Sequence, residues 1–232
     1  MNFNYKSIFF DLDDTLWDIQ TNGKEALSET FDQYGLKNWF ASFEEFYDMY
    51  WSNNLELWAL YRMGAIRKQE LILQRFHYPL QQKGISDESL ALKMNADFLE
   101  ATTGKTKLIP YAKEILEYLF PKYRLFILSN GFTEVQYKKL QNSGLSSYFK
   151  KVILSETAEA NKPNSAIFDY ALKSTRSRRK ESLMIGDSWE ADIIGAKNSR
   201  IDQIFLNRDN KTDMEFQPTY VVKTLKEIEG IL

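Results

Sequence analysis

The segment FFDLDDT near the amino terminus carries residues whose types and spacing could do chemistry. Asp11 follows a short apolar run, and a carboxylate that ends a strand projects from the carboxyl edge of its sheet, where open α/β sheets bind ligands. The turn that follows can bring Asp13 back beside Asp11. Two close carboxylates repel each other and normally need a cation or a shared proton. A hard divalent ion with oxygen ligands, such as Mg²⁺, meets that need, although the pair alone fits ordinary turn chemistry equally well.

A second acidic segment, MIGDSWEAD, follows a later apolar run. Gly186 allows close approach of the backbone, and Asp187 emerges from the carboxyl end of another predicted strand. Glu190 and Asp192 fall in the first turn of the next predicted helix, where acids also favour the helix dipole. For Glu190 that capping role is the favoured interpretation. For Asp187, placed opposite Asp11, the metal interpretation is favoured.

Two polar segments at further strand ends could bind an anion. Ser129, Asn130 and Gly131 lead into a predicted helix, and a hydroxyl, a side-chain amide and free backbone N–H groups at a helix start form an anion cradle. Lys162 stands just before another predicted helix and is a point charge suited to a phosphoryl oxygen. Each pattern is weak alone, because SNG describes any tight turn and a single lysine is more often solvated.

Short apolar runs predict the elements that position these residues. Continuous apolar character favours strands that are buried on both faces of a parallel sheet. Helical patterns separate the later runs, so the sequence predicts a doubly wound α/β sheet. The predicted strands are residues 7–10, 125–128, 152–154, 183–185 and 204–206. The predicted helices are residues 111–120, 133–143, 165–173 and 190–198.

The long stretch after the first predicted strand has hardly any strand pattern. Its apolar residues fall at helical spacing, as at Ala26, Leu27 and Phe31. We therefore predict an inserted all-helical cap over residues 18–107, with the α/β core formed by residues 1–17 and 108–232. The cap is rich in aromatic residues, and most of these are expected to pack its interior.

Composition limits the classes of function. The 232 residues are 44% hydrophobic and 27% charged with a net charge of −2, so nothing indicates a nucleic acid or membrane partner. The run Arg176–Lys180 is better explained as solvated surface than as a nucleic-acid contact. The absence of cysteine excludes disulfides, thiolate zinc sites and cysteine nucleophiles, and fits a cytoplasmic protein. The single histidine, His77, excludes multi-histidine metal sites, and no pattern indicates an oligomeric state.

The four polar segments, each after a strand and in this order, resemble the motif set of the haloacid dehalogenase superfamily. That set is DxDxT, then a serine or threonine, then a lysine, then GDxxxxD, and the likeness covers the whole core. The helical insert resembles the cap of that superfamily. One departure concerns the loop Ala158–Asn161 before Lys162, where relatives often have a glycine.

The resemblance implies a phosphatase mechanism. Asp11 would be the nucleophile that forms an aspartyl-phosphate, and Asp13 would protonate the leaving alcohol and then activate water. Mg²⁺ would be held by the Asp11 carboxylate, the Asp13 carbonyl and Asp187, with Asp192 steadying these ligands. The expected phosphate-binding groups are Ser129, the N–H groups near Asn130 and Gly131, and Lys162.

Two further features bear on the substrate. Dehalogenases of this superfamily carry no acid two residues after the nucleophile, so Asp13 favours phosphoryl transfer. The cap segment LWALYRMGAIRKQELILQRF and the core segment SNGFTEVQ resemble the bacterial pyrimidine 5′-nucleotidases of the superfamily, which implies a nucleoside monophosphate as the small phosphorylated substrate. Phe132 and Trp189 could line a base pocket, although helix packing explains Trp189 equally well. The alternatives are a phosphatase of a sugar phosphate or phosphoglycolate, a phosphomutase and a non-catalytic binding protein.

Overall fold

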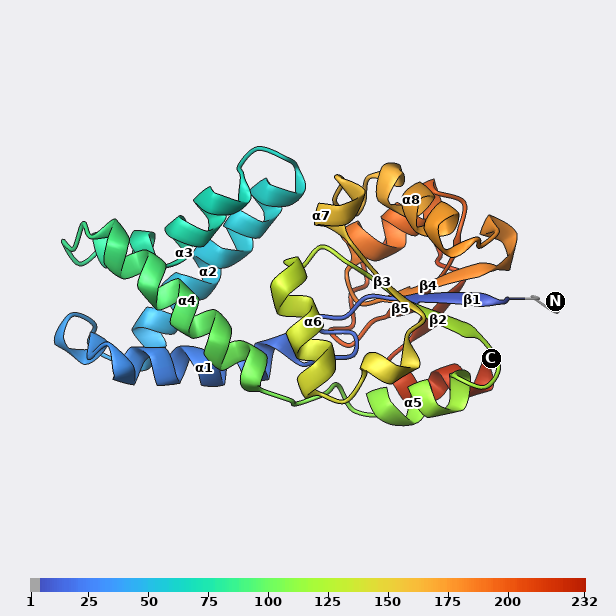
Figure 1. Ribbon diagram of the computed structural model, residues 1–232, viewed down its shortest axis with the longest axis horizontal. Coiled ribbons are helices and arrows are strands. Elements are labelled where there is room, and N and C mark those ends of the chain that lie inside the picture. The colour runs from blue at the N-terminus through green and yellow to red at the C-terminus, as the bar shows by residue number, and fades with distance from the viewer. Residues whose placement is uncertain (1–4) are drawn as a thin grey trace. The chain divides into compact units, whose positions relative to one another are not determined.

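The computed structural model of the protein describes residues 5–232. Contacts between residues divide the chain into two compact units (Figure 1). One unit combines the stretch up to Asp18 with Thr106–Leu232, and the other is Ile19–Lys105. The first unit contains the strands of the described residues, whereas the second is built from helices.

The first unit is built on one parallel sheet, which has six strands within residues 5–232. The strand order β3-β2-β1-β4-β5-β6 confirms the predicted doubly wound α/β fold. Strand β6 was not predicted from the sequence, because this edge strand has only three residues. The strands are β1 (Ser7–Phe10), β2 (Arg124–Ser129), β3 (Lys151–Leu154), β4 (Ser182–Gly186), β5 (Asp202–Leu206) and β6 (Tyr220–Val222).

Strand β1 lies inside the sheet because its four residues, SIFF, are all buried and suit a strand covered on both faces. Phe10 is in register with Ile127 of β2 and with Ile185 of β4. The chain adds β2 and β3 on one side of β1 and then crosses from β3 to β4 on its other side, so the strand order reverses between the neighbouring strands β1 and β4. The carboxyl ends of these strands therefore meet at the switch point where open α/β sheets bind ligands.

Helices cover both faces of this sheet (Figure 1). On one face, Phe168 of α8 and Ala196 of α9 belong to the same buried cluster as Phe9 and Met184. The stretch predicted as one helix over residues 190–198 is instead a π-helix, Trp189–Ile194, that runs into α9. The α-helices of this unit are α5 (Ala112–Leu119), α6 (Thr133–Asn142), α7 (Ser155–Ala158), α8 (Ser165–Thr175) and α9 (Gly195–Asn198).

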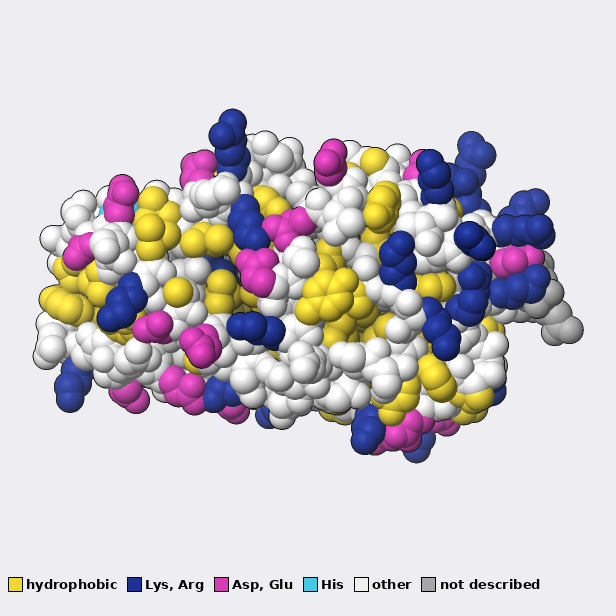
Figure 2. Space-filling model, viewed as in Figure 1, with side chains coloured by type: hydrophobic (Ala, Val, Ile, Leu, Met, Phe, Trp, Pro, Cys, Tyr) yellow, Lys and Arg dark blue, Asp and Glu magenta, His cyan; other side chains and the backbone are white. Residues whose placement is uncertain are grey.

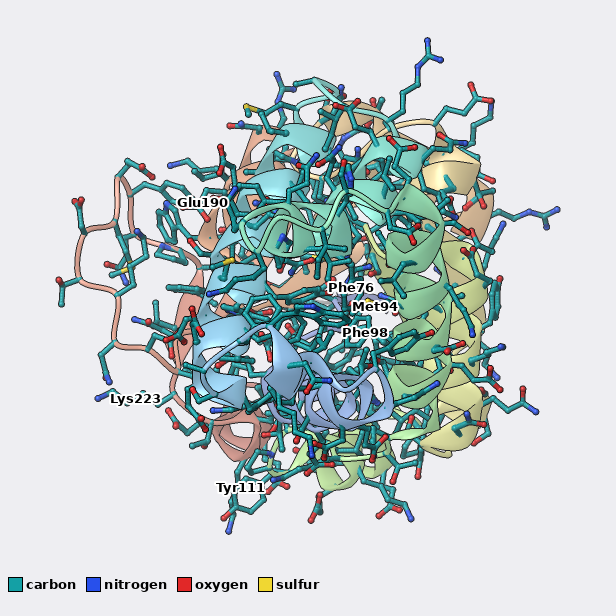
Figure 3. The ribbon with its side chains drawn as sticks, turned by 90° about the vertical axis from the view of Figure 1, so that its left-hand side faces the viewer. Phe76, Met94, Phe98, Tyr111, Glu190 and Lys223 are labelled. Atoms are coloured by element: carbon teal, nitrogen blue, oxygen red, sulfur yellow. The ribbon has the colours of Figure 1, made fainter. Side chains whose placement is uncertain are left out.

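The second unit packs its helices around an aromatic interior. The rings of Tyr50 and Phe76 have centroids 4.9 Å apart, and both side chains are fully buried. Figure 3 shows Phe76, Met94 and Phe98 close together in this interior, so the apolar spacing seen in the sequence marks the buried face. The helices are α1 (Ile19–Gln33), α2 (Phe43–Arg62), α3 (Lys68–Gln81) and α4 (Glu88–Gly104).

On the face shown in Figure 2, charged side chains are scattered among apolar and other polar groups, and Lys and Arg gather at the end of the first unit where β1 begins. The basic run Arg176–Lys180 precedes β4 and is largely exposed. Arg178 forms an ion pair with Glu181 at 3.7 Å, and Arg179 forms another with Asp169. None of the helices in residues 5–232 has the length and apolar character needed to span a bilayer.

Candidate active site

Three aspartates meet at the carboxyl edge of the sheet. Asp11 directly follows β1, Asp187 directly follows β4, and Asp192 lies in the π-helix that comes next. One carboxylate oxygen from each lies within 4.8 Å of the other two. Asp11 and Asp192 are buried, and Asp187 is half-buried. The register of β1 with β4 explains how residues so far apart in the chain come together.

Lys162 lies among these aspartates and is 2% exposed. Its Nζ atom donates to Oδ1 of Asp11 and to Oδ1 of Asp192, each at 2.6 Å. It also donates to the carbonyl oxygen of Leu128 at 2.8 Å. Burial alone would lower the pKa of Lys162, but the two carboxylates outweigh it and raise the pKa above its usual value. Lys162 is therefore a buried cation whose three ammonium hydrogens all have acceptors.

The aspartates carry more negative charge than Lys162 can offset. Burial raises the pKa of Asp11 to about 7, and the nearby Asp192 and Asp13 add to the effect while Lys162 opposes it. Burial also raises the pKa of Asp187 well above its usual range, with Asp11 and Asp192 contributing. A divalent cation would reverse these shifts, and a set of carboxylate oxygens is the ligand type that Mg²⁺ prefers. The residues present therefore fit that ion.

Two neighbours hold the acidic groups in place. The hydroxyl of Thr15 donates to Oδ1 of Asp187 at 2.7 Å and accepts from the Asp187 backbone N–H at 3.1 Å. The backbone N–H of Ser188 donates to Oδ2 of Asp192 at 3.1 Å. A Cβ atom at Gly186 would lie 2.2 Å from that same Oδ2 atom, so only glycine leaves room for Asp192.

The side chain of Asp13 turns toward α6. Its Oδ1 atom accepts from Nζ of Lys139 at 2.6 Å, and its Oδ2 atom accepts from Nε2 of Gln136 at 2.8 Å. The cluster of carboxylate oxygens around Asp11 does not include that of Asp13. The motif residues thus form two groups in space, an acidic cluster with Lys162 and a second group around Asp13.

The predicted phosphate-binding residues lie where β2 ends and α6 begins. The hydroxyl oxygen of Ser129 accepts from the Gly131 backbone N–H at 3.1 Å and from Nε2 of Gln136 at 2.7 Å. The side-chain amide of Asn130 bonds the backbone of Lys162, accepting from its N–H at 2.8 Å and donating to its carbonyl oxygen at 2.9 Å. Asn130 therefore links the end of β2 to the segment that carries Lys162.

The loop before Lys162 has a left-handed residue where a glycine would be favoured. Glu159 ends α7 with φ of 52°, a conformation that costs a residue with a Cβ atom more than it costs glycine. The chain therefore adopts a left-handed backbone in this loop without a glycine. Lys162 still reaches Asp11 from this loop.

The two rings considered for a base pocket are both buried in the first unit. Phe132 is 2% exposed and Trp189 is 3% exposed. The Trp189 ring packs against Phe205 and Phe216, with centroids 5.4 and 4.9 Å away, and its Nε1 atom donates to Glu215 at 2.6 Å. The packing interpretation therefore describes the position of Trp189.

Three residues that touch the predicted site were given no role on the basis of the sequence. Thr15 was part of the DxDxT pattern but was given no role. Lys139 was predicted only as part of a helix and Gln136 only as the end of the segment SNGFTEVQ, although their spacing of three residues places them on one helix face. Apolar periodicity cannot predict that two polar residues of a distant helix contact an acidic residue.

Comparisons with known proteins agree on one family. Residues 5–200 match the haloacid dehalogenase-like hydrolases. Pyrimidine 5′-nucleotidase YjjG of Escherichia coli is 32% identical over 97% of this chain and 96% of its own length. Pyrimidine 5′-nucleotidase PynA of Streptococcus pneumoniae is 32% identical over 97% of this chain and 93% of its own. The crystal structure of the HAD-hydrolase YfnB of Bacillus subtilis bound to magnesium superposes with a TM-score of 0.89 at 28% identity, covering 99% of both chains.

Proposed function

The chain belongs to the haloacid dehalogenase-like hydrolases and is an enzyme of that family, and we propose that it is a Mg²⁺-dependent phosphatase that uses Asp11 as its nucleophile. One observation carries the proposal. Asp11 stands at the switch point of the sheet with its Oδ1 atom 2.6 Å from Lys162, inside a cluster that also contains Asp187 and Asp192. A carboxylate in that position can attack a phosphorus atom whose oxygens are bound by cations.

Asp11 would take the phosphoryl group from the substrate. A carboxylate oxygen attacks phosphorus, the bond from phosphorus to the ester oxygen breaks, and an aspartyl-phosphate forms. Lys162 is held beside Asp11 by Asp192 and the Leu128 carbonyl oxygen, so its positive charge stays next to the transferring group. Ser129 and the backbone N–H groups at the start of α6 would bind the remaining phosphoryl oxygens.

Asp13 would act first as the general acid and then as the general base. It gives a proton to the ester oxygen as the alcohol leaves, and it takes one from the water that later attacks the aspartyl-phosphate. That second attack breaks the bond between phosphorus and the Asp11 oxygen, so inorganic phosphate leaves and the Asp11 carboxylate is restored. The carboxyl group of Asp13 lies outside the acidic cluster, which suits a proton carrier better than a metal-binding side chain.

The carboxylates of Asp11 and Asp187 would hold Mg²⁺ together with the backbone carbonyl of Asp13. When bound, the ion supplies positive charge that offsets the charge of the phosphoryl oxygens. Asp192 would act indirectly, since its two oxygens are engaged by Lys162 and by the Ser188 N–H. This arrangement needs no residue from the second unit.

For the substrate we propose a nucleoside monophosphate with a pyrimidine base. Support comes from the two relatives named pyrimidine 5′-nucleotidases, which match nearly the full length of this chain, cap included. The same chemistry would act on a sugar phosphate or on phosphoglycolate, because the roles proposed for the core residues involve only the phosphoryl group.

The proposal is tested in two steps with the purified full chain. Hydrolysis of p-nitrophenyl phosphate is expected only with Mg²⁺ and is expected to be lost in Asp11→Asn. Full activity of that variant, or in metal-free buffer, would contradict the mechanism. A screen of UMP and dTMP against sugar phosphates and phosphoglycolate then tests the substrate. Turnover of UMP and dTMP no faster than that of the sugar phosphates would exclude the nucleotidase.

A further inference from the structure

Helix α6 presents two buried polar side chains to the proposed proton carrier. Gln136 is fully buried and Lys139 is 3% exposed, although lysine is among the residues least often buried. They lie three residues apart, so they share one face of the helix. Gln136 ends the segment SNGFTEVQ and Lys139 lies outside every motif named above, and their burial calls for a chemical explanation.

Lys139 and Gln136 together hold both carboxylate oxygens of Asp13. Nζ of Lys139 lies 2.6 Å from Oδ1 and Nε2 of Gln136 lies 2.8 Å from Oδ2. Nζ of Lys139 also lies 4.3 Å from the centroid of the fully buried Trp17 ring, which fixes the ammonium group from a second side. With each oxygen held by a separate donor, the Asp13 side chain has one defined orientation.

Gln136 also determines how Ser129 can act. Its Nε2 atom has two hydrogens, and it donates to Ser129 Oγ at 2.7 Å as well as to Asp13. Ser129 Oγ accepts a second hydrogen bond from the Gly131 N–H at 3.1 Å. A serine oxygen has two acceptor sites, so both are occupied and the hydroxyl hydrogen is left to donate. A phosphoryl oxygen needs such a donor.

We propose that Gln136 and Lys139 are positioning residues that hold Asp13 to take the proton from the attacking water when phosphorylated Asp11 is hydrolysed. The inference rests on the proposed function. In this step the water oxygen bonds to phosphorus, the bond from phosphorus to the Asp11 oxygen breaks, and one water proton passes to Asp13. A carboxylate with both oxygens fixed by donors points a defined lone pair at the water.

The test separates the two half-reactions with p-nitrophenyl phosphate, whose good leaving group needs little help from an acid. Lys139→Met is expected to lower kcat by about 10-fold or more, since a general base contributes about 10²–10⁴-fold. The kcat/KM value reports only the first half-reaction and is expected to stay within about 3-fold, so KM falls with kcat. Phosphorylated protein is expected to accumulate and to be seen by mass spectrometry after acid quenching.

The chain offers matched controls on the same helix. Lys138 is the exposed neighbour of Lys139, and Lys138→Met is expected to leave both constants unchanged. Lys139→Arg keeps a donor to Asp13 and is expected to restore part of kcat. Gln136→Glu removes the donors to Asp13 and Ser129, so it is expected to lower kcat and also to weaken competitive inhibition by inorganic phosphate. Gln141→Glu, on the exposed face, is its control.

Equal losses of kcat and kcat/KM in Lys139→Met without accumulation of phosphorylated protein would overturn the inference, as would no loss at all. If Lys139→Met does not fold, Gln136→Met tests the accumulation of phosphorylated protein with the ion pair intact, and its kcat/KM is expected to fall as well because Ser129 loses a donor. Failure of both to fold would show that the residues are structural and would also overturn it. An Asp11→Asn variant with full activity would instead contradict the proposed function itself.

Discussion

The Nζ atom of Lys162 lies 2.6 Å from Oδ1 of Asp11, although the two residues are 151 positions apart in the chain. The contact joins a loop after β3 to the end of β1, and β2 lies between these strands. Asn130 at the end of β2 bridges the gap by bonding both the N–H and the carbonyl oxygen of Lys162. The position of this lysine thus depends on the ends of three neighbouring strands.

Removing this ammonium group is expected to impair both activity and stability. Lys162→Met leaves Asp11 and Asp192 as buried carboxylates without their cation. Breaking a buried ion pair in this way costs about 3–5 kcal/mol. We expect hydrolysis of p-nitrophenyl phosphate to be lost and the melting temperature in metal-free buffer to fall, with Mg²⁺ restoring part of the stability.

Differential scanning calorimetry measures the melting temperature with and without Mg²⁺, and the p-nitrophenyl phosphate assay measures the activity. Lys180→Met is the matched control, because that lysine is exposed and lies just before the amino end of β4, away from the carboxyl ends that form the site. An unchanged melting temperature for Lys162→Met would show that the acidic cluster does not depend on its charge.

The acidic cluster is expected to make Mg²⁺ binding depend on pH. The pKa of Asp11 is raised to about 7 by burial, so below that pH the metal-free protein carries a proton on the cluster that Mg²⁺ must displace. Affinity for Mg²⁺ is therefore expected to rise from pH 5.5 to pH 7.5. Isothermal titration calorimetry at both pH values measures it, and equal affinities would contradict the prediction.

The raised pKa of Asp11 also makes the stability of the metal-free protein depend on pH. A carboxyl group whose pKa is higher in the folded than in the unfolded chain binds its proton more tightly when folded. Its contribution is full below the unfolded value and is lost as the pH rises through about 7. The metal-free protein is thus expected to lose stability between pH 4 and pH 7, and Asp11→Asn is expected to flatten that loss in urea titrations.

The sequence predicted the strand ends of the site because the relevant information is local. Continuous apolar runs marked β1, β2 and β4, and the residues that end them are the aspartates and the serine that meet in space. Parallel strands end at the same edge, so the order of motifs along the chain was enough to place Asp11 beside Asp187.

The contacts of α6 could not be predicted in the same way. Lys139 reaches Asp13 across 126 positions, and this depends on how the helix packs against the turn after β1. Periodicity gives the faces of a helix but not the rotation that points a polar residue inward. The same limit applies to the π-helix at Trp189–Ile194, whose hydrogen-bonding pattern leaves no distinct mark in apolar spacing.

The hydroxyl of Thr15 is expected to control how Asp187 binds metal. Thr15→Val keeps the shape of the side chain but removes the donor to Asp187 and the acceptor for its N–H. Loss of a group that orients a metal ligand typically lowers metal affinity about 10–100-fold. We expect a weaker response to Mg²⁺ in activity titrations, and Thr15→Ser is expected to retain most of the affinity. Equal affinity in Thr15→Val and the wild type would contradict this role.

A methyl group at Gly186 is expected to displace Asp192. The Cβ atom would lie 2.2 Å from Oδ2 and 2.4 Å from the carboxylate carbon, which is too close for any contact between these atoms. The backbone of β4 is fixed by its pairing with β1, so the Asp192 side chain must move and release its bonds to Lys162 and to the Ser188 N–H. We expect Gly186→Ala to lose about 1–3 kcal/mol of stability, the usual cost of overpacking.

Activity distinguishes this displacement from a general loss of packing. With Asp192 moved, Lys162 keeps only Asp11 and the Leu128 carbonyl oxygen as acceptors, so phosphoryl transfer is expected to slow even at temperatures where the variant is folded. Gly230→Ala is the matched control, because nothing lies within 4 Å of its Cβ position. A Gly186→Ala protein that melts and turns over p-nitrophenyl phosphate like the control would show that the carboxylate finds another place without consequence for the site.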